Sequence, residues 1–192
     1  MEILEKDIED VVWYLANNNR EKLYEIGFPE LHRHTLRQVR LGEYGVADII
    51  AWDVLTGMLD GVKLRKVSVQ IIEFKKDVIG HAALMQSHRY ETAIREILQS
   101  FDIHFDEIIC WHILVGSDID HFGDFPFLYS NMHSTIIATY KHDLVDGTKF
   151  SVVGKCWSKR DGHGIKEDKI NEIKKTLKQQ LRNYGKEINR HQ

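Results

Sequence analysis

Three charged side chains stand where the alternation of two apolar strands would bury them. Side chains along a strand point alternately to its two faces. Asp48 of the segment VADIIAWDV therefore shares a face with Ile50. Glu73 and Lys75 of the segment VSVQIIEFKK share a face with Ile71. A buried charge is costly unless it is paired, bound to a metal or used in chemistry, so these residues are the first candidates for a functional site.

Two carboxylates and an ammonium group on neighbouring strands suit a hard divalent cation. Mg²⁺ usually takes one or two carboxylates and keeps other positions for water and phosphate oxygens. The lysine could then hold an attacking water or neutralise charge on the phosphate. Taken alone, Asp48, Glu73 and Lys75 also fit a structural ion pair at the edge of a sheet.

The helix predicted over 79–100 carries two further polar residues in an apolar setting. At 100° per residue, Gln86 and Tyr90 fall in the centre of the apolar stripe and lie one turn apart. A buried amide needs hydrogen-bond partners, and the charged strand ends could provide them. The opposite, solvated side of this helix is expected to carry His88, Glu91 and Arg95.

The elements that position these residues follow from hydrophobic periodicity. In the first half of the chain we predict a helix over 3–16, strands over 36–41, 46–54 and 67–76, and a hairpin connection at 55–66. In the second half we predict strands over 108–116, 134–140 and 150–157, a helix over 165–185, and an irregular segment at 117–133. The order favours an α/β or α+β domain with a central mixed sheet flanked by helices.

Composition indicates one folded domain over 1–192, because 43% of the 192 residues are hydrophobic and the formal net charge is only −3. The motif-bearing core would be 3–116, and the strands and helix of 134–185 would extend it. Cys110 and Cys156 lack CxxC spacing and are expected to be free thiols in a reducing compartment. We find no signal peptide and no apolar stretch of 18 residues, so we expect a cytoplasmic protein outside the membrane.

The motifs GVAD (45–48), EFK (73–75) and QSHRY (86–90) resemble the G-x-x-D, E-x-K and Q-x-x-x-Y motifs of the RecB-like branch of the PD-(D/E)xK nuclease superfamily. The stretch RQVRLGEYGVADIIAWD is similar to the catalytic domain of NucS-type endonucleases. The resemblance covers residues 3–100 and implies a restriction-endonuclease-like core. The interval from Asp48 to Glu73 is longer than usual for the family, which implies an extended hairpin.

The resemblance also implies a metal site. Asp48 and Glu73 would bind Mg²⁺ or Mn²⁺ directly, together with the backbone carbonyl of Phe74. An acid of the first helix would complete the site through water, and EKDIED offers Glu5 and Glu9. Helix geometry leaves both residues open, whereas the family pattern E-x-x-I favours Glu5.

The implied activity is hydrolysis of DNA phosphodiester bonds by an endonuclease, through in-line attack of water. Lys75 would position that water and stabilise charge, and Gln86 and Tyr90 would orient the lysine and the scissile phosphate. DNA is the implied partner, and the candidate phosphate contacts are Arg37, Arg40 and Lys76. The later strands and terminal helix could extend the sheet, shape the substrate site or form a homodimer surface. The alternative function is a catalytically silent nucleic-acid-binding or assembly protein on the same fold.

Overall fold

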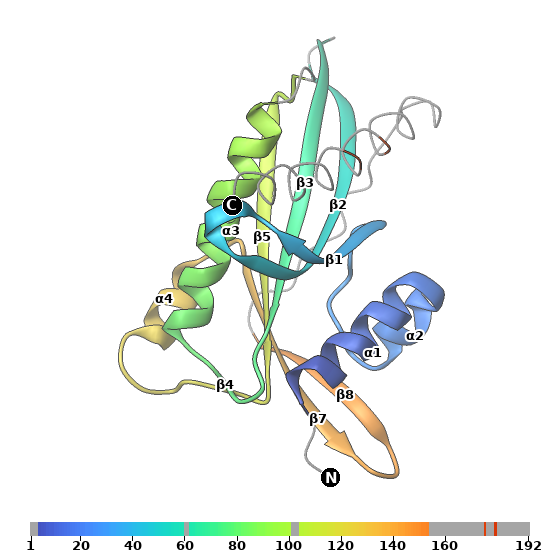
Figure 1. The fold of residues 1–192 in the computed structure, drawn as a ribbon, viewed down its shortest axis with the longest axis vertical. Coiled ribbons are helices and arrows are strands. Elements are labelled where there is room, and N and C mark those ends of the chain that lie inside the picture. Colours follow the sequence, from blue (N-terminus) through green and yellow to red (C-terminus); the bar gives the residue numbers. More distant parts are fainter. Residues whose placement is uncertain (1–3, 60–61, 101–103, 154–174, 176–178, 180–192) are drawn as a thin grey trace.

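A six-stranded mixed sheet forms the centre of the protein (Figure 1). The computed structural model describes residues 4–59, 62–100 and 104–153, together with Lys175 and Gln179. The strands of the sheet, in spatial order, are β1 (His34–Arg40), β2 (Val46–Leu59), β3 (Val62–Phe74), β5 (Glu107–Gly116), β7 (Thr135–Asp143) and β8 (Gly147–Val153). The pairs β3–β5 and β5–β7 are parallel, and the other neighbours are antiparallel.

Helices cover both faces of this sheet. They are α1 (Glu5–Asn18), α2 (Arg20–Glu25), α3 (His81–Gln99), α4 (Phe125–Asn131) and the 3-10 turn η1 (Gly42–Tyr44). In Figure 1, α3 lies along one side of the sheet and α1 with α2 along the other. A separate parallel pair joins the short strands β4 (Val78–Ile79) and β6 (Asp118–Ile119). Within the described residues, no helix is both long enough and apolar enough to cross a membrane.

Strand alternation divides the interior into two main cores. Ile50 and Ile71 belong to the core that packs under α3, whereas Ile49 and Ile72 belong to the core that packs under α1. Because successive side chains point to opposite faces, β2 and β3 contribute side chains to both cores. The β5 segment is apolar almost throughout, as is typical of a parallel strand buried on both faces. Helix α3 supplies the crossover that a parallel β3–β5 pair requires.

The expected architecture is confirmed at the level of a mixed sheet flanked by helices. The predicted strand over 108–116 corresponds to β5, and the extended hairpin is confirmed because β2 pairs with β3 as far as Leu59–Val62. The strand predicted to reach residue 157 is described as far as Val153. The predicted helix over 165–185 lies outside the described residues, apart from Lys175 and Gln179.

Several sequence-based bounds differ from the structure, and three differences bear on the site or its surroundings. The predicted helix does not begin at Ile79, because this residue pairs with Ile119 in the β4–β6 ladder and α3 begins at His81. Strand β3 ends at Phe74, so Lys75 lies just beyond the strand. The segment 117–133 is not wholly irregular, since it contains β6 and α4. At the start of α3, a contact with a distant segment, the β4–β6 ladder, decides the local structure.

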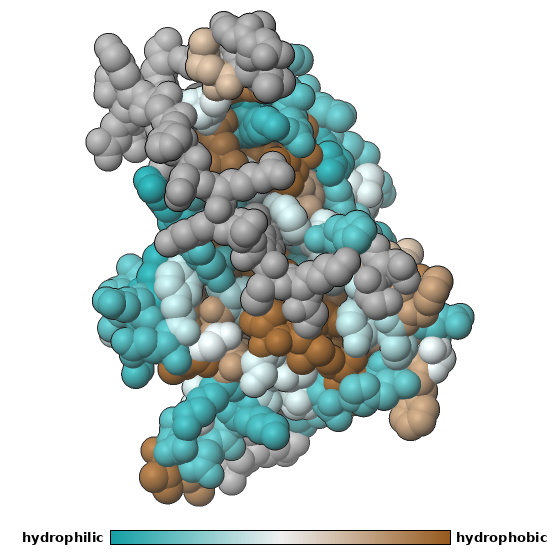
Figure 2. Space-filling model, turned by 180° about the vertical axis from the view of Figure 1, so that it is seen from behind, coloured by the Kyte–Doolittle hydropathy of each residue, from teal (hydrophilic) through white to brown (hydrophobic). Residues whose placement is uncertain are grey.

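The β7–β8 hairpin ends in an apolar tip. Leu144 and Val145 are 82% and 93% exposed, and Figure 2 shows a small hydrophobic patch at the end of the mainly hydrophilic projection at the lower left. The hairpin is anchored at the middle of β8, where the Phe150 N–H donates to the Ile26 carbonyl at 2.7 Å. Gly27 adjoins that contact with a φ of +88°, a conformation that glycine adopts without strain.

Candidate active site

The candidate site lies where β2 separates from β3. Pairing between these strands begins at Ile49–Ile72, while β2 stays paired with β1 beyond that point. Asp48 precedes Ile49, and its Oδ2 atom accepts the N–H of Phe74 at 2.9 Å. The carboxylate therefore takes the place that a strand carbonyl would otherwise fill, and it is fixed at the fork between the two strands.

Glu73 is the most buried acid of the site, with 2% of the residue exposed. Its Oε1 atom accepts a hydrogen bond from Lys75 Nζ at 2.7 Å. Its Oε2 atom is buried and has no hydrogen-bond partner among the described residues. A buried carboxylate oxygen without a donor is destabilising, so this atom marks a place where a cation would be favourable.

Gln86 and Tyr90 of α3 connect Lys75 to the start of β2. Lys75 Nζ donates to Gln86 Oε1 at 3.4 Å, and Gln86 Nε2 donates to the Tyr90 hydroxyl at 2.6 Å. The hydroxyl in turn donates to the Val46 carbonyl at 2.8 Å. The structure thus brings the two helix residues to the charged strand ends, and the chain of hydrogen bonds fixes the position of the ammonium group.

Gly45 has a structural reason to be glycine. Its φ is +112°, and a Cβ atom added there would lie 3.4 Å from the Tyr90 ring and hydroxyl. A side chain would therefore be strained at this position and crowd Tyr90. Gly45, the first position of the G-x-x-D motif, therefore leaves room for the Tyr90 side chain.

The carboxyl groups of the site resist ionisation. Burial raises the pKa of Asp48 to about 6, against the lowering effect of the Phe74 N–H bond. Burial, reinforced by the charge of Asp48, raises the pKa of Glu73 to about 7. Burial opposes the charge of Lys75, but the hydrogen bond and charge of Glu73 outweigh it and raise the lysine pKa. At neutral pH the lysine of the site is therefore protonated. The positive charge near the two carboxyl groups is too small to bring their pKa values back to the ordinary range.

Glu9 of α1 is engaged by β1. Its Oε1 atom accepts hydrogen bonds from Arg37 Nε at 2.5 Å and Gln38 Nε2 at 2.9 Å. Gln38 Nε2 also lies 3.4 Å from Asp48 Oδ1, so the amide links the two acids. Gln38 adopts a φ of +49°, which is uncommon for a residue other than glycine. Sequence reasoning missed Gln38, since no motif marks it.

Glu5 lies closer to the other end of the site. Its Oε2 atom accepts the N–H of Lys76 at 3.0 Å. The charge of Glu5 contributes to the raised pKa of both Asp48 and Glu73, whereas Glu9 contributes to that of Asp48. Both first-helix candidates therefore border the site, and Glu5 acts on both strand acids.

The three predicted phosphate contacts have different surroundings. Arg37 forms ion pairs with Glu9 and Asp10, so its guanidinium group is already engaged by acids. Arg40 is exposed, and Lys76 is half-buried beside the site. The Lys76 carbonyl accepts a hydrogen bond from the Tyr140 hydroxyl at 2.7 Å, which holds the backbone after Lys75 against β7.

The donor set fits a hard divalent cation. Asp48 and Glu73 offer carboxylate oxygens, Glu73 Oε2 has no other partner among the described residues, and Phe74 between Glu73 and Lys75 offers a backbone carbonyl. Oxygen donors of this kind are the ligands of Mg²⁺ and Mn²⁺. A cation bound there would also add positive charge beside the two carboxyl groups and so favour their ionised form.

A second polar cluster on α3 contradicts the sequence-based prediction for that side of the helix. His88 and Glu91 do not face solvent alone, because Glu91 Oε2 lies 2.8 Å from Nε2 of the fully buried His112 on β5. Arg95 completes the cluster with a hydrogen bond from Nε to Glu91 Oε1 at 2.7 Å. The signal was a histidine inside the apolar segment IICWHILVG, together with His-x-x-Glu spacing on the helix.

Comparison with protein-family models, with curated proteins and with solved structures finds no match for this chain. A functional interpretation therefore depends on the residues and their geometry. The structure itself establishes a mixed α/β fold whose six-stranded sheet carries helices on both faces.

Proposed function

We propose that this protein is a divalent-metal-dependent deoxyribonuclease of the PD-(D/E)xK type with a restriction-endonuclease-like core, and that it cuts phosphodiester bonds within DNA strands. The observation that carries the proposal is the convergence of Asp48, Glu73 and Lys75 at the fork between β2 and β3, with one buried oxygen of Glu73 left without a partner among the described residues. The Gln86–Tyr90 pair supports it, because both residues extend the hydrogen-bond network of Lys75.

Asp48, Glu73 and the Phe74 carbonyl would hold Mg²⁺ or Mn²⁺ in this proposal. The bound cation would polarise a phosphoryl oxygen and make water a stronger nucleophile. Of the two first-helix acids, Glu5 is the better candidate to complete the site through water. Glu9 already accepts hydrogen bonds from Arg37 and Gln38, whereas Glu5 influences the pKa of both strand acids.

Lys75 is the residue that would act on water and phosphate. Its raised pKa keeps it protonated at neutral pH, so it can donate hydrogen bonds but cannot accept a proton. A fixed ammonium group of this kind orients a nucleophilic water and stabilises negative charge that develops on the phosphoryl oxygens. Its hydrogen bonds to Glu73 and Gln86 hold it in one position before substrate arrives.

DNA would approach the site along the edge strand β1 and the turn after β3. The candidate phosphate contacts there are Arg37, Arg40 and Lys76, of which Arg37 also pairs with Glu9 and Asp10. Contacts from such cations position the backbone without reading sequence. Binding should accordingly weaken as salt concentration rises.

The test is DNA cleavage by purified protein with Mn²⁺ or Mg²⁺ on duplex, single-stranded and branched substrates. Lys75→Ala should reduce the rate at least about 100-fold, because loss of one preorganised donor costs on the order of 10²–10³ in rate. Lys66→Ala is the matched control, since Lys66 lies on the same strand and pairs with Glu107 at the surface. It should retain the activity of the wild type.

Two results would contradict the proposal. One is equal behaviour of the wild type and Lys75→Ala on every substrate. The other is salt-dependent DNA binding by the wild type without cleavage under any divalent-metal condition, which would instead support the catalytically silent alternative. Circular dichroism and thermal melting of both variants check that a loss of cleavage does not reflect a loss of folding.

A further inference from the structure

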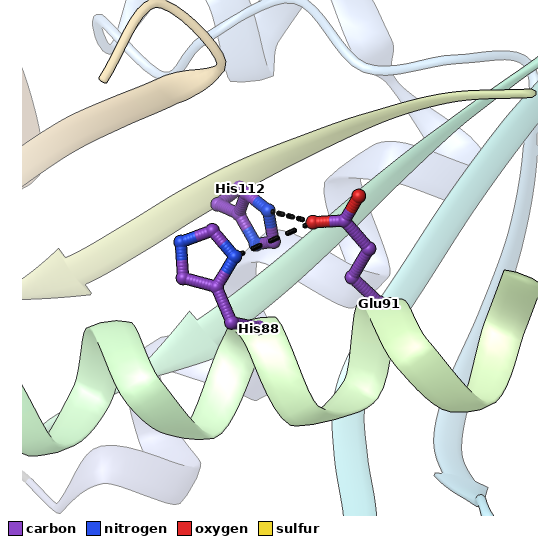
Figure 3. A group of neighbouring side chains, drawn as sticks. All are labelled: His88, Glu91 and His112. Carbon is purple, nitrogen blue, oxygen red and sulfur yellow. Dashed lines mark hydrogen bonds and ion pairs between the residues drawn. The ribbon is translucent and has the colours of Figure 1, made fainter.

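Two imidazoles and a carboxylate converge on one point between α3 and β5. His88 and Glu91 project from the helix and His112 from the strand beneath it, as Figure 3 shows. Glu91 Oε2 lies 2.8 Å from His112 Nε2 and 3.4 Å from His88 Nδ1. The three groups together offer ligand atoms that all lie within 4.8 Å of one another.

The other oxygen of Glu91 is held by Arg95. The Nε and Nη2 atoms of Arg95 each lie 2.7 Å from Glu91 Oε1, and its Nη1 atom donates to the Ile108 carbonyl at 3.1 Å. Arg95 therefore fixes the carboxylate and leaves Oε2 facing the two imidazoles. Outer groups that orient a ligand in this way are a regular feature of metal sites.

Hydrogen bonding within the cluster leaves two imidazole atoms without partners. Glu91 Oε2 has lone pairs for both imidazoles, with His112 Nε2 at 2.8 Å and His88 Nδ1 at 3.4 Å, but His88 Nε2 and His112 Nδ1 are buried and have no hydrogen-bond partner among the described residues. The centroids of the two rings lie 4.2 Å apart. Among the described residues this is the single group of three or more histidine, cysteine or acidic side chains with metal-binding geometry.

We propose that His88, Glu91 and His112 bind Zn²⁺, or a closely related first-row divalent ion, which joins helix α3 to strand β5. Imidazole nitrogen suits these metals, whereas Mg²⁺ prefers oxygen donors alone. Three protein ligands and a remaining position for water form a common zinc arrangement. The side chains of His88 and Glu91 are 32% and 19% exposed, so water and the metal can reach the cluster.

This zinc site does not depend on the proposed nuclease function. The hard-oxygen site at Asp48 and Glu73 approaches α3 near Gln86 and Tyr90, whereas the zinc site uses His88 and Glu91. A variant at one site can therefore be compared directly with a variant at the other.

The experiment measures Zn²⁺ affinity by competition with a chromophoric chelator, in excess Mg²⁺ to occupy the hard-oxygen site. The wild type should bind one equivalent tightly, and His88→Ala should weaken this binding at least about 100-fold, since loss even of a group that only orients a ligand costs on the order of 10- to 100-fold. His81→Ala is the matched control, because His81 is an exposed histidine in the first turn of the same helix. His81→Ala and Glu73→Gln should both bind zinc like the wild type.

A second variant guards against a folding artefact. Glu91→Gln nearly preserves the shape of the side chain while removing its charge, and it should also weaken zinc binding. Zinc should raise the melting temperature of the wild type and of His81→Ala, but not that of His88→Ala or Glu91→Gln. Equal zinc affinity in the wild type and His88→Ala would overturn the proposal, as would loss of binding in Glu73→Gln with retention in His88→Ala.

Discussion

Replacement of Glu73 by glutamine should stabilise the metal-free protein. Burial raises the pKa of Glu73 from its ordinary value of 4.5 to about 7. Between these two pH values the folded state holds a proton that the unfolded chain has released, so stability falls as pH rises through this window. At about 1.4 kcal/mol per pKa unit, the ionised form lowers stability by about 3 kcal/mol above pH 7. An amide has nearly the shape of a protonated carboxyl group and cannot ionise.

The gain should depend on pH in a defined way. In the absence of divalent ions, Glu73→Gln should exceed the wild type in free energy of unfolding by about 3 kcal/mol at pH 8 and by less than about 1 kcal/mol at pH 5. Urea denaturation with a chelator present, at both pH values, measures the difference. Glu107→Gln is the control, because Glu107 is a half-exposed acid on the neighbouring strand. It should change stability by less than about 0.5 kcal/mol.

Divalent ions should make the wild type more stable than Glu73→Gln. Mn²⁺ at about 1,000 times its dissociation constant would stabilise the wild type by about 4.1 kcal/mol, which exceeds the advantage of about 3 kcal/mol of Glu73→Gln at pH 8, whereas Glu73→Gln lacks the carboxylate that binds the ion. The reasoning is refuted if Glu73→Gln is less stable than the wild type at pH 8 without metal. It is refuted equally if the gain is the same at pH 5 as at pH 8, because burial of an ionisable group would then not be its cause.

Two further substitutions test the packing around the site and the sheet. Gly27→Ala should destabilise the fold by about 2–4 kcal/mol in urea denaturation, because φ is +88° and the new Cβ would collide with the Phe150 carbonyl oxygen; an unchanged unfolding midpoint would argue against that contact. Tyr90→Phe removes the hydroxyl that joins Gln86 to the Val46 carbonyl and should cost about 1–2 kcal/mol in stability. It should also lower DNA cleavage while metal affinity stays the same, and full cleavage activity would exclude a positioning role.

Local periodicity predicted that several of the candidate residues would lie together. Strand alternation identified Asp48 and Glu73 as charges on an apolar face, and helical periodicity brought Gln86 and Tyr90 to the same place. These inferences needed only the repeat of each element, which the sequence displays directly. The hydrogen bonds from Lys75 through Gln86 to Tyr90 agree with that reasoning.

Features that depend on distant contacts were missed. The sequence around Gln38 does not predict its positive φ or the contacts of its amide with Glu9 and Asp48. The helical projection assigned His88 and Glu91 to solvent because it contained no information about β5, which extends the sheet beneath that flank of α3 and supplies His112. A helix packed on a broad sheet buries a wider arc than its apolar stripe suggests.

Helix α3 presents consecutive residues to two different sites, since Tyr90 contacts the network of Lys75 and Glu91 contacts His112. If binding at one of the proposed metal sites shifts α3, the other proposed site lies only one residue away along the helix. If zinc changes the affinity for Mg²⁺ by some factor, thermodynamic reciprocity requires Mg²⁺ to change the affinity for zinc by the same factor. Two titrations, each performed with and without the other ion, would give that coupling free energy twice and independently.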